Sequence, residues 1–397
     1  MKFDSLYDFK YKISKDILCN YLARTVTVAP CFYKLSKTNT PHIKKFILNT
    51  NAKYIQRAAT CWIATLEDFD SYKEQKAFID DLHEIDPDII FEACIFENVT
   101  FNVNDIPIPD WVFKDFGLTV EDRNFSFEKM CFPSRKYLNQ WGDNTSVPDI
   151  TRTESMMFMY YRACEYIKAG FEGLHMGQVH LIGENDTGWK CWTKLLNMIR
   201  EFAYHNARRN MVLINAHTHG IIGSDGLLLF DFHAFPSRPM ADCSQKAHKP
   251  SENDPQKALF EIGHFDSIYF KSLGGKTHSG WSCDSLPYLV ELDNYDDLPD
   301  PNHLNIPDKN DVRCWGMDEI TWFANQPQSY RSEFLKYAYE WVKSISSGNG
   351  FFALPCERIA AICDKEGNFY RTCYFAYNSD NYADGNNDEE IIKEILK

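Results

Sequence analysis

The sequence has 397 residues, of which 44% are hydrophobic and 25% charged, as in an ordinary globular protein. Lysine and arginine number 42 against 56 acidic residues, which gives a formal net charge of -14 at pH 7. This balance argues against a general nucleic-acid binder, because contacts with phosphates need a basic face. No apolar run reaches the roughly 18 residues of a membrane-spanning helix, so no membrane partner is expected.

The cysteines and the first residues indicate a compartment. The 13 cysteines are scattered, with no C-x-x-C pair, and most lie in apolar contexts. This usage is typical of reduced, buried thiols. The opening MKFDSLYDFKYK has no uninterrupted apolar core and does not resemble a secretory signal. A cytoplasmic protein is therefore expected.

The first hundred residues begin a repeating strand and helix pattern. A short strand is expected near Thr25, and Thr40 with Pro41 marks a helix start. Residues 53–64 read as a buried strand, 68–86 as an amphipathic helix, and 88–101 as the next strand. We expect residues 1–50 to form a segment packed on a barrel that begins at residue 51.

The pattern lapses over residues 102–150, which hold several prolines and glycines. We interpret this segment as a long loop over the barrel, with a short helix at 111–116. Regularity resumes with a helix that begins near Thr153 and ends at Gly170. A strand over 171–182, a helix over 189–209 and a strand over 211–217 follow.

The second half continues the alternation. An apolar run near residue 227 ends in Asp231 and His233, and further strands are expected near 267, 287 and 351. A long helix near 317–345 is interrupted by Pro327. Residues 358–397 are expected to form a β-hairpin and a polar tail, outside a barrel of residues 51–357.

Eight apolar strands alternate with helices, near residues 54, 89, 173, 211, 227, 267, 287 and 351. This count predicts an α/β fold of the TIM-type (β/α)8 barrel class, with long loops at the carboxyl-terminal face of the strands. A doubly wound open sheet is the main alternative, but the G-x-G-x-x-G turn that it favours is absent. Gly274-Gly275-Lys276 is no phosphate loop, because Phe270 stands where the first glycine is needed.

In such barrels the active site lies at the carboxyl ends of the strands. Several of the predicted strands end in carboxylates, amides or imidazoles, and burying so many polar groups for stability alone would be costly. A polar pocket is therefore predicted. Its members are Arg57, Glu97, Gln178, His180, Glu184, Asn215, His217, Asp231, His233, Glu291 and Asp293.

Glycoside hydrolysis suits this pocket, because it needs two carboxyl groups across the scissile bond. Glu184 and Glu291 are the predicted pair, near the ends of a middle and a late strand. This arrangement resembles TIM-barrel glycoside hydrolases, over residues 53–355. The resemblance implies that Glu184 is the general acid/base and Glu291 the nucleophile. Those enzymes often place Asn before Glu at the acid/base position, whereas this chain has Glu184 before Asn185.

The remaining members of the pocket are expected to bind substrate. Aromatic side chains in or near loops, among them Trp141, Trp281 and Trp315, are candidates for contacts with the apolar faces of sugar rings. The expected partner is a small-molecule or oligosaccharide substrate, and neither a cofactor nor a metal is expected.

Two alternatives stay open. His217, His219, Asp231 and His233 could form a mixed nitrogen and oxygen site for metal-assisted hydrolysis. The barrel could also be a non-catalytic carbohydrate binder, since a binding pocket uses the same residue types. Acids that are each held by an arginine would favour a binding or structural role over catalysis. A serine nucleophile is disfavoured because the chain has no G-x-S-x-G.

Overall fold

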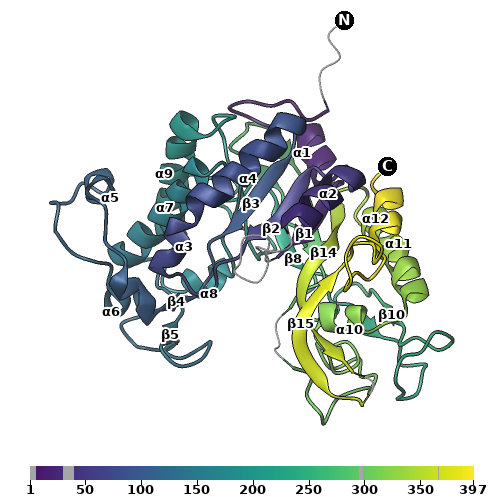
Figure 1. The fold of residues 1–397 in the computed structure, drawn as a ribbon. Coiled ribbons are helices and arrows are strands. Elements are labelled where there is room, and N and C mark those ends of the chain that lie inside the picture. The colour runs from purple at the N-terminus through teal and green to yellow at the C-terminus, as the bar shows by residue number, and fades with distance from the viewer. Residues whose placement is uncertain (1–5, 30–39, 295–297, 365) are drawn as a thin grey trace, which may run out of the picture. The chain divides into compact units, whose positions relative to one another are not determined.

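The structure is a computed structural model that describes residues 6–29, 40–294, 298–364 and 366–397 (Figure 1). The chain divides into two compact units. Unit 1 comprises Met1–Ile17, Ala59–His233 and Leu273–Leu286, and unit 2 comprises Leu18–Ala58, Ala234–Ser272 and Pro287–Lys397. None of the described helices is both long and apolar enough to cross a membrane.

The main sheet has the strand arrangement of a β/α barrel. Its path is β7-β6-β3-β2-β1-β14-β13-β8, and β15 pairs with β14 off this path. The neighbours whose register is resolved along the path run parallel. The predicted TIM-type barrel is confirmed, as a nearly closed sheet. The eight strands are β1 (Thr25–Val28), β2 (Tyr54–Ala59), β3 (Ile90–Cys94), β6 (Gly173–His175), β7 (Leu213–Asn215), β8 (His233–Pro236), β13 (Tyr288–Glu291) and β14 (Gly350–Cys363).

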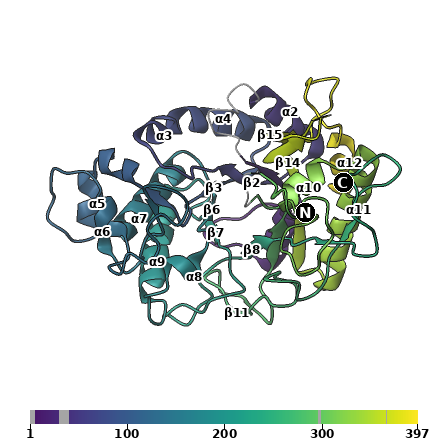
Figure 2. The same ribbon diagram turned by 90° about the horizontal axis from the view of Figure 1, so that it is seen from below.

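In unit 1, β3, β6 and β7 form a parallel run covered by amphipathic helices. α4 (Tyr72–Ile85) precedes β3, α7 (Thr153–Lys168) connects β3 to β6, and α9 (Lys190–Asn206) connects β6 to β7. α7 and α9 lie side by side (Figure 2). α9 buries a stripe at helical spacing. The shorter elements are α3 (Leu66–Asp70), β4 (Val99–Thr100), η1 (Phe101–Asp105), α5 (Asp110–Asp115), α6 (Phe127–Met130), β5 (Thr145–Ser146), α8 (Val179–Ile182), β11 (Gly275–Lys276) and β12 (Ser282–Cys283).

The long loop at 102–150 is ordered around a small core of its own. Val112 and Phe113 of α5 are buried together with Phe127 of α6, and Met157 and Phe158 of α7 belong to the same cluster. The short helix expected at 111–116 is present as α5. Apolar side chains spaced along the loop therefore anchor it to α7, which explains how so long a connection keeps one conformation.

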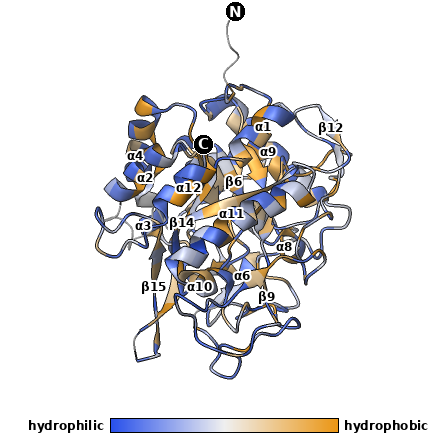
Figure 3. Ribbon diagram, turned by 90° about the vertical axis from the view of Figure 1, so that its right-hand side faces the viewer, coloured by the Kyte–Doolittle hydropathy of each residue, from blue (hydrophilic) through white to orange (hydrophobic). Residues whose placement is uncertain are grey.

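In unit 2, β1, β2, β13 and β14 run parallel, and α11 (Gln328–Ile345) packs against β14. α11 alternates hydrophilic and hydrophobic residues along its turns (Figure 3). The interruption predicted at Pro327 is confirmed, because α10 (Glu319–Ala324) ends before it. The other elements are α1 (Lys15–Leu22), α2 (Thr40–Thr50), β9 (Met240–Ala241), β10 (Ala258–Leu259), β15 (Phe369–Phe375) and α12 (Glu389–Ile395).

One of the eight predicted strand positions was wrong. The segment near 267 forms no strand, because Phe265 and Phe270 have φ of 45° and 60°, which extended backbone does not allow. The eighth strand is instead β1, which pairs with β2 and β14. Residues 1–50 thus contribute a barrel strand and do not merely pack on the barrel. The expected hairpin of β14 and β15 is present, but residue 358 falls inside β14.

Two predicted strand ends also shift, and each shift moves candidate residues. The strand expected over 171–182 ends at His175, because Gly177 adopts φ +69° and residues 179–182 form α8. The strand expected near 227–233 begins only at His233. Asp231 therefore lies at the amino end of β8, and its backbone N–H donates to the carbonyl of Ile214 in β7 at 2.8 Å.

Candidate functional site

A chain of buried polar groups runs across the strands of unit 1. The Nδ1 of His175 lies 2.7 Å from Oδ1 of Asn215, whose Nδ2 donates to Oε2 of Glu92 at 2.6 Å. All three residues are fully buried. Because the amide oxygen can only accept, His175 carries its proton on Nδ1. The ring of His217 meets the ring of His175 edge-on, with centroids 4.7 Å apart.

A carboxylate and an amide face each other just past the strand ends. Gln178 donates to Glu97 twice, from its backbone N–H at 3.1 Å and from Nε2 at 2.8 Å. Gly177 makes this approach possible, since a Cβ there would lie 2.2 Å from Oε2 of Glu97. The carbonyl of Gly177 also accepts from the backbone N–H of His217 at 2.9 Å. The structure thus brings Glu97, Gln178 and His217 together, as predicted residues of one site.

Aromatic rings stand beside these polar groups. Trp62 packs edge-on against Phe96, with centroids 5.2 Å apart, and against Trp141, with centroids 5.6 Å apart. The ring of Phe96 lies 6.1 Å from the ring of His175. Each of the three aromatic residues is half-buried, and Asn98 fixes the backbone of Trp62 by donating to its carbonyl at 3.0 Å. Unit 1 therefore has an aromatic wall at the carboxyl ends of its strands.

Two of the predicted histidines have lowered pKa values. His180 is exposed on α8, and its Nε2 lies 3.0 Å from the hydroxyl of Thr218. Partial burial, followed by the charge of His219, lowers the pKa of His180. The same two causes lower the pKa of the buried His233 to about 3. Both rings are therefore neutral at neutral pH, which suits hydrogen bonding to hydroxyl groups.

Glu184 lies just past α8, exposed, with its carboxylate held by two neighbours. Lys136 Nζ donates to both oxygens at 2.8 and 2.7 Å, and the Tyr137 hydroxyl donates to Oε2. These hydrogen bonds, that of Lys136 first, lower the pKa of Glu184 below its usual range. A general acid needs the opposite shift, because it must hold a proton at working pH. The role of Glu184 as general acid/base stays a prediction.

Glu291, on β13 in unit 2, is bound on both oxygens. Arg57 pairs with Oε1, Arg358 donates to Oε2 at 2.7 Å, and Gln56 contacts Oε1 at 3.5 Å. The side chain is 1% exposed. Asp293 adds a second acid 3.7 Å from Arg358. The predicted partnership of Arg57 with a strand-end carboxylate is present, and it forms a buried ion-pair network.

Three further predicted residues lie away from these groups. Asp231 accepts from the backbone N–H of Ile214 at 2.9 Å, at the amino end of its strand. The indole of Trp281 donates to the carbonyl of Ile13 at 3.0 Å, and the fully buried indole of Trp315 donates to that of Lys257. Trp315 is thus a core residue, which corrects its expected role as a sugar platform.

The alternative metal cluster does not form. Among the described residues, no group of three or more histidine, cysteine or acidic side chains converges in an arrangement that could hold a metal ion. The physical reason is the strand shift, since His217 follows the carboxyl end of β7, whereas Asp231 precedes β8.

Sequence reasoning missed several residues at this edge. Trp62 and Phe96 were not predicted, although both lie within three residues after apolar strands. Their position after β2 and β3 was a usable signal. Arg358 was missed because it lies 67 residues from Glu291, and no local pattern joins the two.

The fold, but not the sequence, resembles known proteins. No family model and no curated protein matches the chain. Solved structures that resemble it include a debranching enzyme of Nostoc punctiforme, with 13% identity over 95% of this chain and 82% of that one and a TM-score of 0.42. The glycoside hydrolase domain of PelA from Pseudomonas aeruginosa has 11% identity over 77% and 88%, with a TM-score of 0.33.

A GH27 β-L-arabinopyranosidase from Geobacillus stearothermophilus has 9% identity over 54% of each chain, with a TM-score of 0.31. The chain spans about half the length of two of these relatives. It covers 54% of the arabinopyranosidase and 52% of the native form of the debranching enzyme. At these identities and TM-scores the comparisons carry no argument about function, which has to be argued from the site.

Proposed function

We propose that the protein is a glycoside hydrolase-like barrel that binds a carbohydrate at the carboxyl ends of β3, β6 and β7. One observation supports this most: the half-buried rings of Trp62, Phe96 and Trp141 stand next to the carboxylate and amide pair of Glu97 and Gln178. A sugar ring offers apolar C–H faces and a rim of hydroxyl groups, and this wall offers a complementary surface for each.

Cleavage of a glycosidic bond needs two carboxyl groups with different tasks. Glu184 and Glu97 lie at the two ends of α8, since Glu97 binds Gln178 at its start and Glu184 follows its end. We assign these two acids to the reaction. The lowered pKa of Glu184 fits the base or nucleophile, and we assign Glu97, whose two oxygens accept from Gln178, as the second carboxyl group.

Glu291, the nucleophile expected from sequence, fits a different role. Attack on an anomeric carbon requires an accessible carboxylate, whereas the Glu291 side chain is 1% exposed and both its oxygens are bound by guanidinium groups. We therefore propose that Glu291 anchors the strands of unit 2.

A non-catalytic carbohydrate binder is the second candidate. It is favoured by the contacts of Glu184, whose two oxygens already accept from Lys136 and Tyr137. A binder would keep the aromatic wall and the Glu97–Gln178 pair without turnover.

The test is a fluorescence titration of the protein with neutral oligosaccharides, combined with an assay for new reducing ends. Trp62→Ala is expected to weaken binding at least about tenfold, since stacking on an aromatic ring is lost. Glu97→Gln is expected to abolish cleavage. Tyr370→Ala, an exposed tyrosine on β15, is the matched control. Binding without cleavage would select the binder, and binding that Trp62→Ala and Glu97→Gln both leave unchanged would remove this site.

A further inference from the structure

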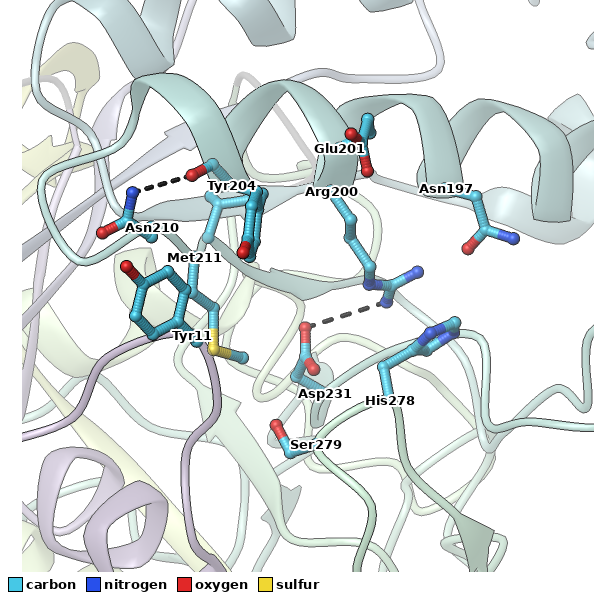
Figure 4. A pocket seen from close by; sticks show the side chains of 11 residues that line it. Tyr11, Asn197, Arg200, Glu201, Tyr204, Asn210, Met211, Asp231, His278 and Ser279 are labelled. Atoms are coloured by element: carbon cyan, nitrogen blue, oxygen red, sulfur yellow. Dashed lines mark hydrogen bonds and ion pairs between the residues drawn. The ribbon is translucent and has the colours of Figure 1, made fainter.

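Unit 1 has a cavity beside residues 210–212, which precede the amino end of β7. The cavity has a volume of about 340 Å³. It is lined by α9, by residues 210–212 at the amino end of β7, by Asp231 and by two loops (Figure 4). The volume falls at the lower end of the roughly 300–1,000 Å³ that small-molecule pockets occupy.

The two loops that close the cavity are pinned to each other. Ser279 accepts from the backbone N–H of Ile13 at 3.2 Å, and Trp281 donates to the carbonyl of Ile13 at 3.0 Å. The backbone N–H of Tyr11 donates to the carbonyl of Arg209 at 3.0 Å, just past α9. The wall is therefore built from segments that are hydrogen-bonded to one another. This also gives Trp281 a defined place, beside this cavity.

The floor of the cavity offers a donor and an acceptor side by side. Arg200 Nη2 donates to the carbonyl of Leu229 at 2.8 Å and lies 3.8 Å from Oδ2 of Asp231. The other terminal nitrogen, Nη1, is buried and has no hydrogen-bond partner in the described part of the chain. A buried donor left in this way is costly. Figure 4 shows the guanidinium between Asp231 and His278.

The charges of the lining disfavour an ionic ligand. The positive charge of Arg200 is balanced by Asp231, and Glu201 adds a further acid to the rim. Partial burial, followed by the charge of Arg200, lowers the pKa of His278 to about 4, so this ring is neutral at neutral pH. An anion would meet two carboxylates, and a cation would meet the arginine. A neutral ligand with hydroxyl groups avoids both costs.

Two half-exposed aromatic side chains stand at the mouth. Tyr11 is 50% exposed and Tyr204 is 49% exposed, and their rings lie 5.3 Å apart in a tilted arrangement. Lys10 lies over the ring of Tyr11, and the ring of His205 meets that of Tyr204 edge-on. The rings are thus supported from outside and present an apolar surface above a polar floor.

From this arrangement we propose that the cavity is a second binding site, for a neutral sugar ring with adjacent hydroxyl groups. Arg200 and Asp231 both line the cavity, so the guanidinium supplies donors and the carboxylate supplies an acceptor for the hydroxyl groups of such a ligand. The tyrosine pair covers one face of the ring. The site takes a sugar independently of the carboxyl-end site and has no part in bond cleavage.

The experiment measures the number of sites and the affinity by calorimetry with neutral monosaccharides, namely glucose, galactose, xylose and arabinose. Glucuronate and galacturonate serve as charged counterparts. Tyr204→Ala and Arg200→Gln are each expected to weaken binding at one site at least about tenfold, and Trp62→Ala is expected to leave that site unchanged. Tyr204→Ala removes a half-exposed side chain, so it keeps the test valid if Arg200→Gln fails to fold. Tyr370→Ala is again the control.

Preferential binding of the uronates, or binding that Tyr204→Ala leaves unchanged, would overturn the proposal. The experiment can refute the two proposed sites independently of each other. If every sugar signal disappears in Trp62→Ala and none in Tyr204→Ala, the carboxyl-end site stands and this one is refuted. If the reverse holds, this site stands and the proposed function loses its support.

Discussion

Replacement of Glu291 by glutamine separates an anchoring role from a catalytic one. The change keeps the shape of the side chain and removes its charge. Arg57 and Arg358, with side chains 7% and 4% exposed, would then lose their shared counter-charge while they stay buried. We therefore expect Glu291→Gln to destabilise unit 2. If Glu291 were the nucleophile, the variant would instead lose turnover and keep the stability of the original protein.

The size of the effect follows from the contacts. Breaking a buried ion pair by removing one partner costs about 3–5 kcal/mol. The low end applies here, because the glutamine oxygen still accepts one hydrogen bond and Asp293 remains 3.7 Å from Arg358. A loss of about 3 kcal/mol is a large share of the roughly 5–15 kcal/mol that stabilises a typical domain. With a urea dependence of about 3 kcal/mol per molar, it lowers the unfolding midpoint by about 1 M.

Urea unfolding followed by circular dichroism gives the midpoint, and hydrogen exchange locates the weakened strands. Faster exchange is expected in β13 and β14, which carry Glu291 and Arg358. Glu128→Gln is the matched control, since its exposed pair with Arg135 contributes less than about 1 kcal/mol. A midpoint equal to that of the control, together with lost turnover, would refute the anchoring role and restore Glu291 as the nucleophile.

Three further changes test other parts of the structure. Gly177→Ala places a Cβ 2.2 Å from Oε2 of Glu97, at a residue whose φ is +69°. It should therefore displace the carboxylate and weaken sugar binding at least about tenfold in a titration. An unchanged affinity would contradict the proposed site. Glu184→Gln should abolish cleavage and leave the thermal midpoint unchanged, because its contact with Lys136 is exposed; retained cleavage would remove it from the reaction. Burial raises the pKa of Asp318 to about 7, so its contribution to stability is full below about pH 4 and is lost as the pH rises through 7. Asp318→Asn should reduce the change in the free energy of unfolding between pH 4 and pH 8, by at most about 4 kcal/mol. An unchanged pH dependence of that free energy would contradict the raised pKa of Asp318.

Local patterns in the sequence determined the class of fold. Apolar runs alternating with amphipathic segments predicted the β/α barrel, and Pro327 predicted the break between α10 and α11. The hairpin of β14 and β15 was visible in its alternating residues. These features depend on the period of the chain and on the backbone limits of proline, which act over a few residues.

Tertiary structure alone decided which residues meet. The run near 227 is as apolar as a strand, yet the strand begins only at His233, which places Asp231 at the opposite end of the barrel strand from the expected site. Glu97 is hydrogen-bonded to Gln178, which lies 81 residues later in the chain. Glu291 is bound by Arg57, which lies 234 residues earlier. Such pairings depend on strand register and on the burial of charge. Both are set by the closing of the sheet, and no local spacing encodes them.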